Sequence, residues 1–394
     1  MPIHRLTGWL SLIALLGWHK DELITITLWL EFVYVWTFHD FKRFESFSLG
    51  DETLIQYRDE EMGKLEALGN NETGHLGFLL QEGISQEKKY SQLETRFDLE
   101  EGISWVFMKP KGVPCFDLNF ISEMQHYHQS IKDGGGKIVA QNGLHSIRYQ
   151  VVASQVPGVF NLGGHLALFS ELIRNSDRQG LMHYAKMCID TLVPRIQHFN
   201  LPLVTISLIQ GDAMGGGFEA ALSSDIIIAE RSSKMGFPEI LFNLFPGMGA
   251  YSFLARKVGT VQAEKIILSG KLYSAVELHA LGLVDVLVED GGGEEAVYDY
   301  VAKQTRHTNG FIAVQKARLR FNPVTYQELL DITSIWVDAA LKLNDKDLKV
   351  MDRFIRSQQK HYVASAKMQH SVEAVQQMSV TAVVQRKTEM TLAL

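Results

Sequence analysis

The stretch Gly211-Asp-Ala-Met-Gly-Gly-Gly-Phe-Glu219 decides the fold of this chain. It follows an apolar run, residues 203–209, whose valine, threonine and isoleucine are typical of a buried parallel strand. The three glycines allow a tight turn, and a helix that begins there leaves unpaired backbone N–H groups at its positive end. A strand, a glycine-rich turn and a helix in this order predict an α/β unit that can stabilise a developing negative oxygen.

A second glutamate lies 239 − 219 = 20 residues further on and ends the run Met235-Gly-Phe-Pro-Glu239. Between the two glutamates, residues 226–229 form an apolar run that predicts another buried strand. A strand with short turns would bring the carboxylate of Glu239 back beside that of Glu219. Apolar neighbours and a second carboxylate raise the pKa of a glutamate, so the pair predicts a general acid/base site rather than two solvated surface residues.

A second loop, Phe160-Asn-Leu-Gly-Gly-His-Leu166, also lies between a predicted strand (148–154) and a predicted helix (166–173). Two N–H donors that share one oxygen form an oxyanion hole, in which the loss of one donor costs about 3 to 4 kcal/mol of barrier. Each glycine segment taken alone could instead mark a simple loop or a close crossing of helix and strand. A phosphate-binding loop is excluded because no Gly-Lys-Ser/Thr follows the glycines, and the dinucleotide fingerprint is absent.

Composition excludes several classes of protein. The 394 residues are 46% hydrophobic, which is typical of a globular chain with a large core in two or three domains. A net charge of −7 gives no reason to expect a nucleic-acid partner. Cys115 and Cys188 lie far apart and fit no metal spacing, so we expect a reduced, cytoplasmic setting and no bound metal.

The chain divides into four regions. Residues 1–90 are an N-terminal extension of unknown role, whose two apolar stretches (6–18 and 23–38) are each shorter than the roughly 18 to 20 residues of a membrane span. We expect a poorly ordered extension there rather than a membrane-associating segment. Strand-then-helix units fill 91–290, helices fill 291–360, and 361–394 is a polar tail, which together predict an α/β layer fold with parallel strands and a helical C-terminal region.

From about residue 96 to 360 the chain resembles the crotonase (enoyl-CoA hydratase/isomerase) superfamily. The most specific motifs are the glycine-rich run that ends at Glu219, the run Pro238-Glu-Ile-Leu-Phe242, and the 20-residue spacing of the glutamates. Within the superfamily the chain is most similar to the diffusible signal factor synthase group. The stretches that carry this similarity are Phe160-Asn-Leu-Gly-Gly164, Gly215-Gly-Gly-Phe-Glu-Ala-Ala-Leu-Ser223, Pro238 to Leu254, Ile335-Trp-Val-Asp338 and Met351-Asp-Arg353.

The resemblance implies a crotonase-like spiral core of ββα turns and a helical C-terminal region that forms a homotrimer. It implies dehydration of a 3-hydroxyacyl thioester, carried on acyl carrier protein, to a cis-2-enoyl chain. Thioester hydrolysis would then release an unsaturated fatty-acid signal of the kind used in quorum sensing. This chemistry needs no metal or redox cofactor, and the resemblance adds a signalling protein as a further expected partner.

The resemblance also implies roles for individual residues. By motif position, the backbone N–H groups of Leu162 and Gly216 would bind the thioester oxygen. Glu219 and Glu239 would divide the removal of the C2 proton and the protonation of the departing hydroxyl. The residues expected to contact substrate are Gly163 and Gly215, beside the donors, and Trp336 and Phe354, which would line the acyl pocket unless they are plain helix core.

One residue departs from the family pattern, and two other functions stay open. His165 stands where the family usually has an aspartate that caps the next helix, and histidine is a poorer cap, so the loop geometry or the choice of substrate could differ. The chain could instead be an ordinary enoyl-CoA hydratase or isomerase of fatty-acid metabolism, acting on a CoA thioester. It could also be a catalytically silent crotonase-fold protein that binds partners, although the presence of both glutamates argues against this.

Overall fold

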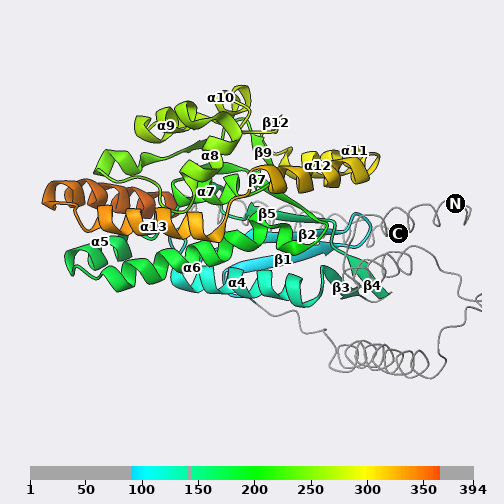
Figure 1. Ribbon diagram of the computed structural model, residues 1–394, viewed down its shortest axis with the longest axis horizontal. Helices are drawn as coiled ribbons and strands as arrows, with labels where there is room; N and C mark the ends of the chain where they lie inside the picture. Colours follow the sequence, from blue (N-terminus) through cyan, green and yellow to red (C-terminus); the bar gives the residue numbers. More distant parts are fainter. Residues whose placement is uncertain (1–89, 141–142, 364–394) are drawn as a thin grey trace, which may run out of the picture. The chain divides into compact units, whose positions relative to one another are not determined.

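The computed structural model describes residues 90–140 and 143–363 (Figure 1). The predicted extension (1–90, apart from residue 90) and residues 364–394 of the predicted tail lie outside the described residues. The described part is a mixed α/β fold built on a six-stranded sheet in the order β1-β2-β5-β7-β9-β12. Its strands are β1 (Leu93–Asp98), β2 (Ile103–Met108), β5 (Tyr149–Ser154), β7 (Val204–Ile209), β9 (Ile226–Glu230) and β12 (Val286–Val288).

The strands from β2 to β12 are parallel, and β1 pairs antiparallel with β2 at one edge. Helices α4 (Leu118–Asp133) and α6 (Arg178–Ile196) lie along one side of this sheet and α11 (Gly293–Thr305) along the other (Figure 1). In β2, Trp105 packs in the core shared with α11, whereas its neighbour Val106 packs in the core shared with α4 and α6. Because both faces are covered, successive residues are buried, and the predicted apolar runs are indeed parallel strands.

A second, four-stranded sheet carries the glycine-rich loops. Its order is β11-β10-β8-β6, with β6, β8 and β10 parallel and β11 antiparallel to β10. A separate two-stranded sheet joins β3 to β4. The strands of these two sheets are β3 (Lys137–Ala140), β4 (Gly143–Ser146), β6 (Gly158–Asn161), β8 (Gly211–Met214), β10 (Lys234–Gly236) and β11 (Leu272–Ser274). Sequence reasoning did not predict either sheet.

The helix that the sequence predicts over residues 166–173 is present in the structure. Between the strands lie α5 (Leu166–Arg174), α7 (Gly216–Leu222), the 3-10 helices η2 (His198–Asn200) and η3 (Pro238–Phe242), α8 (Ala250–Val258), α9 (Thr260–Ser269) and α10 (Ala275–Ala280). The C-terminal region is helical as predicted, with α11, α12 (Thr308–Phe321), α13 (Tyr326–Ala340) and a last helix over residues 345–363. Among the described helices, none combines the length and apolarity needed to cross a membrane.

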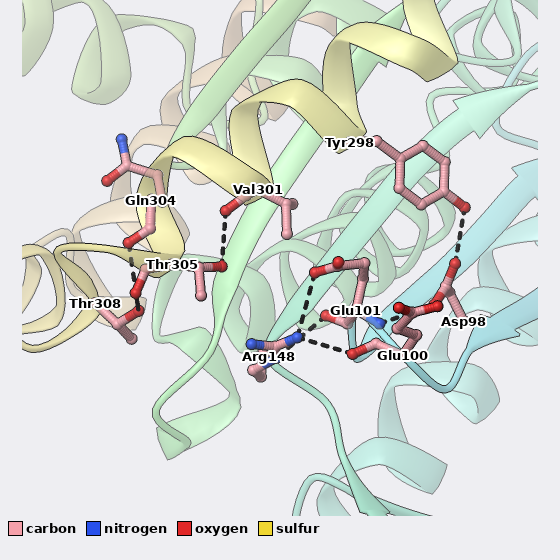
Figure 2. Close-up of polar contacts among 9 residues, drawn as sticks. All are labelled: Asp98, Glu100, Glu101, Arg148, Tyr298, Val301, Gln304, Thr305 and Thr308. Carbon is pink, nitrogen blue, oxygen red and sulfur yellow. Dashed lines mark hydrogen bonds and ion pairs between the residues drawn. The ribbon is translucent and has the colours of Figure 1, made fainter.

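Polar contacts join α11 to the turn between β1 and β2 (Figure 2). The Tyr298 hydroxyl donates to Asp98 Oδ2 over 3.1 Å, a contact between residues 200 positions apart in the chain. On the same side, Arg148 donates to the backbone oxygens of Glu100 (3.1 Å) and Glu101 (3.2 Å). The Tyr298 contact joins the start of the helical C-terminal region to the edge of the six-stranded sheet, and the Arg148 contacts hold the turn after β1.

Candidate active site

The three loops of the predicted site leave the carboxyl ends of three neighbouring parallel strands. β6 leads into residues 162–164, β8 leads into Gly215 and α7, and β10 leads into η3 and Glu239. β8 and β10 are in register, and the Gly215 N–H donates to the Gly236 carbonyl over 2.9 Å. Loops that follow adjacent parallel strands meet at one edge of the sheet, so the four-stranded sheet brings the two glutamates together.

Glu219 is buried in the first turn of α7, with 1% of its surface exposed. Its Oε1 accepts hydrogen bonds from the N–H groups of Met248 (2.7 Å) and Ala250 (2.9 Å). Burial raises the pKa of this carboxyl to about 7, and the hydrogen bonds from the loop at residues 248–250 counteract part of the rise. The carboxylate is therefore held in one orientation, with a pKa near neutrality.

Glu239 is half-buried in η3, and its Oε2 has no hydrogen-bond partner in the part of the chain that the structure describes. Burial raises its pKa to about 8, and the charge of Glu219 adds to the rise. A Cβ placed on Gly215 would lie only 2.2 Å from Glu239 Oε1, so the carboxylate lies directly over the glycine backbone. Near neutral pH one of the two glutamates can hold a proton while the other is charged, which is what acid/base catalysis requires.

Both carboxyl groups face one cavity of about 470 Å³, part of which is open to solvent. Its remaining wall is mostly apolar and includes Phe169, Phe242 and Trp336. Trp336, which the resemblance places in an acyl-pocket wall, lines the same cavity as the two glutamates. Phe354 instead lines an adjoining cavity that shares Glu239 with the first, and it packs edge-on against Phe242 with ring centroids 5.5 Å apart.

The prediction that Leu162 supplies an oxyanion donor is wrong. The Leu162 N–H donates to the Pro114 carbonyl over 2.7 Å, and the Gly163 N–H donates to Asn161 Oδ1 over 2.7 Å. Both N–H groups are therefore already used inside the protein. The sequence could not show this, because the Pro114 acceptor comes from a distant segment of the chain.

The backbone N–H groups of Gly164 and Gly216 have no hydrogen-bond partner among residues 90–140 and 143–363. The two glycines line the same cavity as the glutamates. A Cβ on Gly216 would lie 3.4 Å from the Gly164 nitrogen, so the two donors are close together. The pair that fits an oxyanion hole is thus Gly164 and Gly216, which keeps the predicted Gly216 and moves the other donor by two residues.

Gly163 is expected to be the glycine of this loop that tolerates substitution least. It adopts φ +87°, and a Cβ would lie 2.6 Å from the Met214 oxygen and 2.9 Å from the Gly216 nitrogen. Gly163→Ala should lower the free energy of unfolding by roughly 2 kcal/mol or more and reduce kcat, because the two donor segments must separate. Gly158→Ala is the matched control, since Gly158 also has a positive φ (+71°) but open space around it. Equal losses of stability and activity in the two variants would contradict this account of the loop.

His165 performs the capping role that the sequence assigns to an aspartate at this position. Its Nδ1 accepts a hydrogen bond from the Leu168 N–H over 3.0 Å at the start of α5. Its own N–H donates to the Tyr184 hydroxyl over 3.3 Å, and that hydroxyl donates in turn to the Phe116 carbonyl. The histidine therefore holds the end of the loop in place of the aspartate.

Gln358, from the helix over residues 345–363, is a site residue that sequence reasoning missed. Its Nε2 donates to the carbonyl oxygens of Leu162 (3.0 Å) and Gly164 (3.3 Å). These two bonds fix the peptide groups on either side of the loop that presents the Gly164 N–H. Nothing in the helical sequence around Gln358 distinguishes it from a solvated polar residue.

Comparisons with known proteins show which chains and structures this one is similar to. Residues 144–322 match the family model described as enoyl-CoA hydratase/isomerase. Mitochondrial methylglutaconyl-CoA hydratase of Rattus norvegicus is 30% identical over 178 residues, which cover 45% of this chain and 54% of that protein. 2,3-Dehydroadipyl-CoA hydratase of Escherichia coli (strain K12) is 37% identical over 127 residues, 32% of this chain and 49% of that protein. The chain spans about half the length of the curated relatives it matches.

Solved structures share the fold. An enoyl-CoA hydratase from Bacillus halodurans superposes with a TM-score of 0.56 at 20% identity, covering 68% of this chain and 100% of that one. Pseudomonas aeruginosa DspI superposes with a TM-score of 0.50 at 24% identity, covering 61% of this chain and 92% of that one. The region that matches the enoyl-CoA hydratase/isomerase family model, residues 144–322, contains both glutamates and both glycine donors of the candidate site.

Proposed function

We propose that this protein interconverts 2-enoyl and 3-hydroxyacyl thioesters, with Glu219 and Glu239 as the acid/base pair. The observation that carries the proposal is an apolar cavity that holds two carboxyl groups with raised pKa values beside two N–H groups without a partner among the described residues. The C2 proton of a thioester is weakly acidic, because its removal places negative charge on the carbonyl oxygen. The N–H groups of Gly164 and Gly216 are positioned to stabilise that charge.

The surroundings of the two carboxyl groups support different catalytic roles for Glu219 and Glu239. In the hydration direction, ionised Glu219 takes a proton from water as its oxygen bonds to C3, and protonated Glu239 gives its proton to C2. This order follows from the hydrogen bonds that Glu219 accepts and from the unpartnered Oε2 of Glu239, whose pKa is the higher. Dehydration is the reverse, so Glu239 then removes the C2 proton and Glu219 protonates the departing hydroxyl.

Our finer proposal is that the substrate is a 3-hydroxyacyl chain on acyl carrier protein and that the product leaves as a free cis-2-enoic acid. It rests on the motifs shared with the diffusible signal factor synthase group. An ordinary enoyl-CoA hydratase is the second candidate, and the names of the curated relatives, both CoA hydratases, favour it. A silent partner-binding protein is the least supported, because both carboxyls and both donors are in place.

We also propose a domain organisation, an oligomeric state and a cellular compartment for the protein. The catalytic core would span residues 91–290, and the helical region 291–360 would join three copies of the chain. On α12, Val314 and Phe321 are 69% and 89% exposed, which supports a contact with a further copy there. Cys115 and Cys188 are buried free thiols, in keeping with the cytoplasmic setting that we propose.

The two enzymatic candidates are separated by the products. Purified protein would be incubated with a 3-hydroxyacyl chain on acyl carrier protein and, separately, on CoA, and the products identified by mass spectrometry. Our proposal predicts free 2-enoic acid from the carrier-protein substrate, and none with Glu219→Gln. Enoyl thioester without free acid would reduce the function to that of a hydratase, and no turnover on either carrier would favour the partner-binding candidate.

A further inference from the structure

A second, largely apolar cavity lies between α4, α6 and the large sheet. Its volume is about 470 Å³, part of it open to solvent, and its apolar wall includes Met108, Phe120, Met124 and Phe160. None of the residues assigned above to acid/base chemistry or to oxyanion binding lines it. The proposed function therefore gives this space no role.

The second cavity adjoins the catalytic one. Met248 lines both cavities, and its methyl group lies 3.0 Å from where a Cβ on Gly216 would be. Along α6, Ala185 faces the catalytic cavity and Arg195 the second one, and a helix rises about 15 Å over these ten residues. That separation suits a medium-length acyl chain, and a flexible methionine is a side chain that can move to admit one.

The far end of the second cavity carries a buried arginine, Arg195, that forms no ion pair with any described residue. Arg195 is 3% exposed, and its Nη2 donates to the Ile206 carbonyl (3.3 Å) and to Ser224 Oγ (2.6 Å). Its Nε has no partner, and within the described ranges no carboxylate forms an ion pair with it. The negative charge of Asp225 acts to raise the pKa of Arg195. The Asp225 carboxylate itself is bonded to His198 and Arg318 and not to Arg195.

A second buried polar side chain, that of His128, lines the cavity with this arginine. His128 is 2% exposed, and neither of its ring nitrogens has a hydrogen-bond partner among the described residues. Burial, aided by the charge of Arg195, lowers the pKa of His128 to about 3, so the ring is neutral at physiological pH. A neutral imidazole keeps one N–H that can donate to an anion.

Buried polar atoms nearly always have partners, and an unpaired buried charge is strongly unfavourable. Ordered water could satisfy the hydrogen bonds of Arg195 and His128, but it would not neutralise the charge. A carboxylate would do both, and an acyl chain that passes Met248 would fill the apolar part. We propose that the second cavity binds the distal end of the acyl substrate and that this end is a carboxylate, held by Arg195 and His128.

The proposal rests on the proposed function, because it takes the thioester end of the substrate to lie at Gly164 and Gly216. It narrows the substrate class to monothioesters of dicarboxylic acids of medium length. In such a substrate the charged end pairs with the buried arginine, while a chain that ends in a methyl group leaves Arg195 and His128 unsatisfied. A site built to bond a polar group discriminates strongly against an analogue that lacks it.

The test compares two CoA thioesters of equal medium chain length, one ending in a methyl group and one in a carboxylate. Their dissociation constants would be measured by calorimetry on the full chain carrying Glu219→Gln, so that the result does not depend on turnover. We expect the carboxylate-ended thioester to bind at least about tenfold more tightly. Adding Arg195→Met should remove the preference, and adding Arg306→Met, an exposed arginine in the same chain, should leave it unchanged.

His128→Phe provides a second variant in case the loss of Arg195 unfolds the protein. It keeps a ring that can pack against Phe199 but removes the N–H donor, so the preference should fall without disappearing. Equal binding of the two thioesters would overturn the carboxylate site and leave the proposed function standing. If neither thioester binds on CoA or, in the same assay, on acyl carrier protein, both proposals are overturned.

Discussion

Replacing Glu219 by glutamine is expected to lower kcat by about 10²- to 10⁴-fold while the protein stays folded. Glutamine keeps a side-chain oxygen that can accept the N–H groups of Met248 and Ala250, so the loop over the site is retained. It cannot exchange a proton with water or with the departing hydroxyl. The measurement is the steady-state rate of enoyl thioester hydration, with circular dichroism as a check on folding.

Glu171→Gln is the matched control for this prediction. Glu171 is an exposed glutamate in α5, and among the residues that the structure describes its side chain forms no hydrogen bond or ion pair. Its replacement should change kcat by less than about twofold. A Glu219→Gln enzyme that is folded and as active as this control would remove Glu219 from the mechanism.

Replacing Glu239 by glutamine is expected to abolish turnover to a similar extent and to change how stability depends on pH. In the folded state the pKa of Glu239 rises from 4.5 to about 8, so the folded protein holds a proton that the unfolded chain releases. The wild-type protein therefore loses stability as pH rises from about 4.5 to about 8. Glutamine does not titrate, so above pH 8 the variant should be more stable than the wild type by on the order of a few kcal/mol.

Urea unfolding at pH 5 and at pH 9 measures this effect. The difference between the Glu239→Gln variant and the wild type should grow with pH, whereas Glu171→Gln should follow the wild-type curve in parallel. If the Glu239→Gln curve also runs parallel, the carboxyl is not buried in the way the structure has it. A gain in stability that accompanies a loss of activity would mark Glu239 as a residue kept for function.

The central strands β5, β7 and β9 of the six-stranded sheet and the helical C-terminal region could be predicted from the sequence because their signals are strong. β7 is a run of six buried residues, and both faces of its sheet are covered, so the apolar run is continuous. The four-stranded sheet could not be predicted. Its strands β6, β8, β10 and β11 have three or four residues each, which is too few to show a periodic pattern of apolar residues. Yet the pairing of β8 with β10 is what brings Glu219 and Glu239 together.

At the site, the sequence indicated both glutamates, Gly216 and Trp336, whose motifs are local. The sequence prediction of the second oxyanion donor, Leu162, was wrong. The choice between Leu162 and Gly164 depends on which of their N–H groups already donates a hydrogen bond inside the protein. Pro114 takes the Leu162 N–H from a distant part of the chain, a contact that no local pattern contains. Gln358 was missed for the same reason, since its function arises only where the last helix meets the loop.

The most direct test of the central claim is to incubate the protein with a 2-enoyl-CoA in deuterium oxide and analyse the product by mass spectrometry. If Glu219 and Glu239 act together on one thioester, the wild type will form a 3-hydroxyacyl-CoA with one deuterium at C2. Both glutamine variants will then form almost none. A product that forms equally fast in either variant, or no product from the folded wild type on either CoA or acyl carrier protein, would contradict the claim.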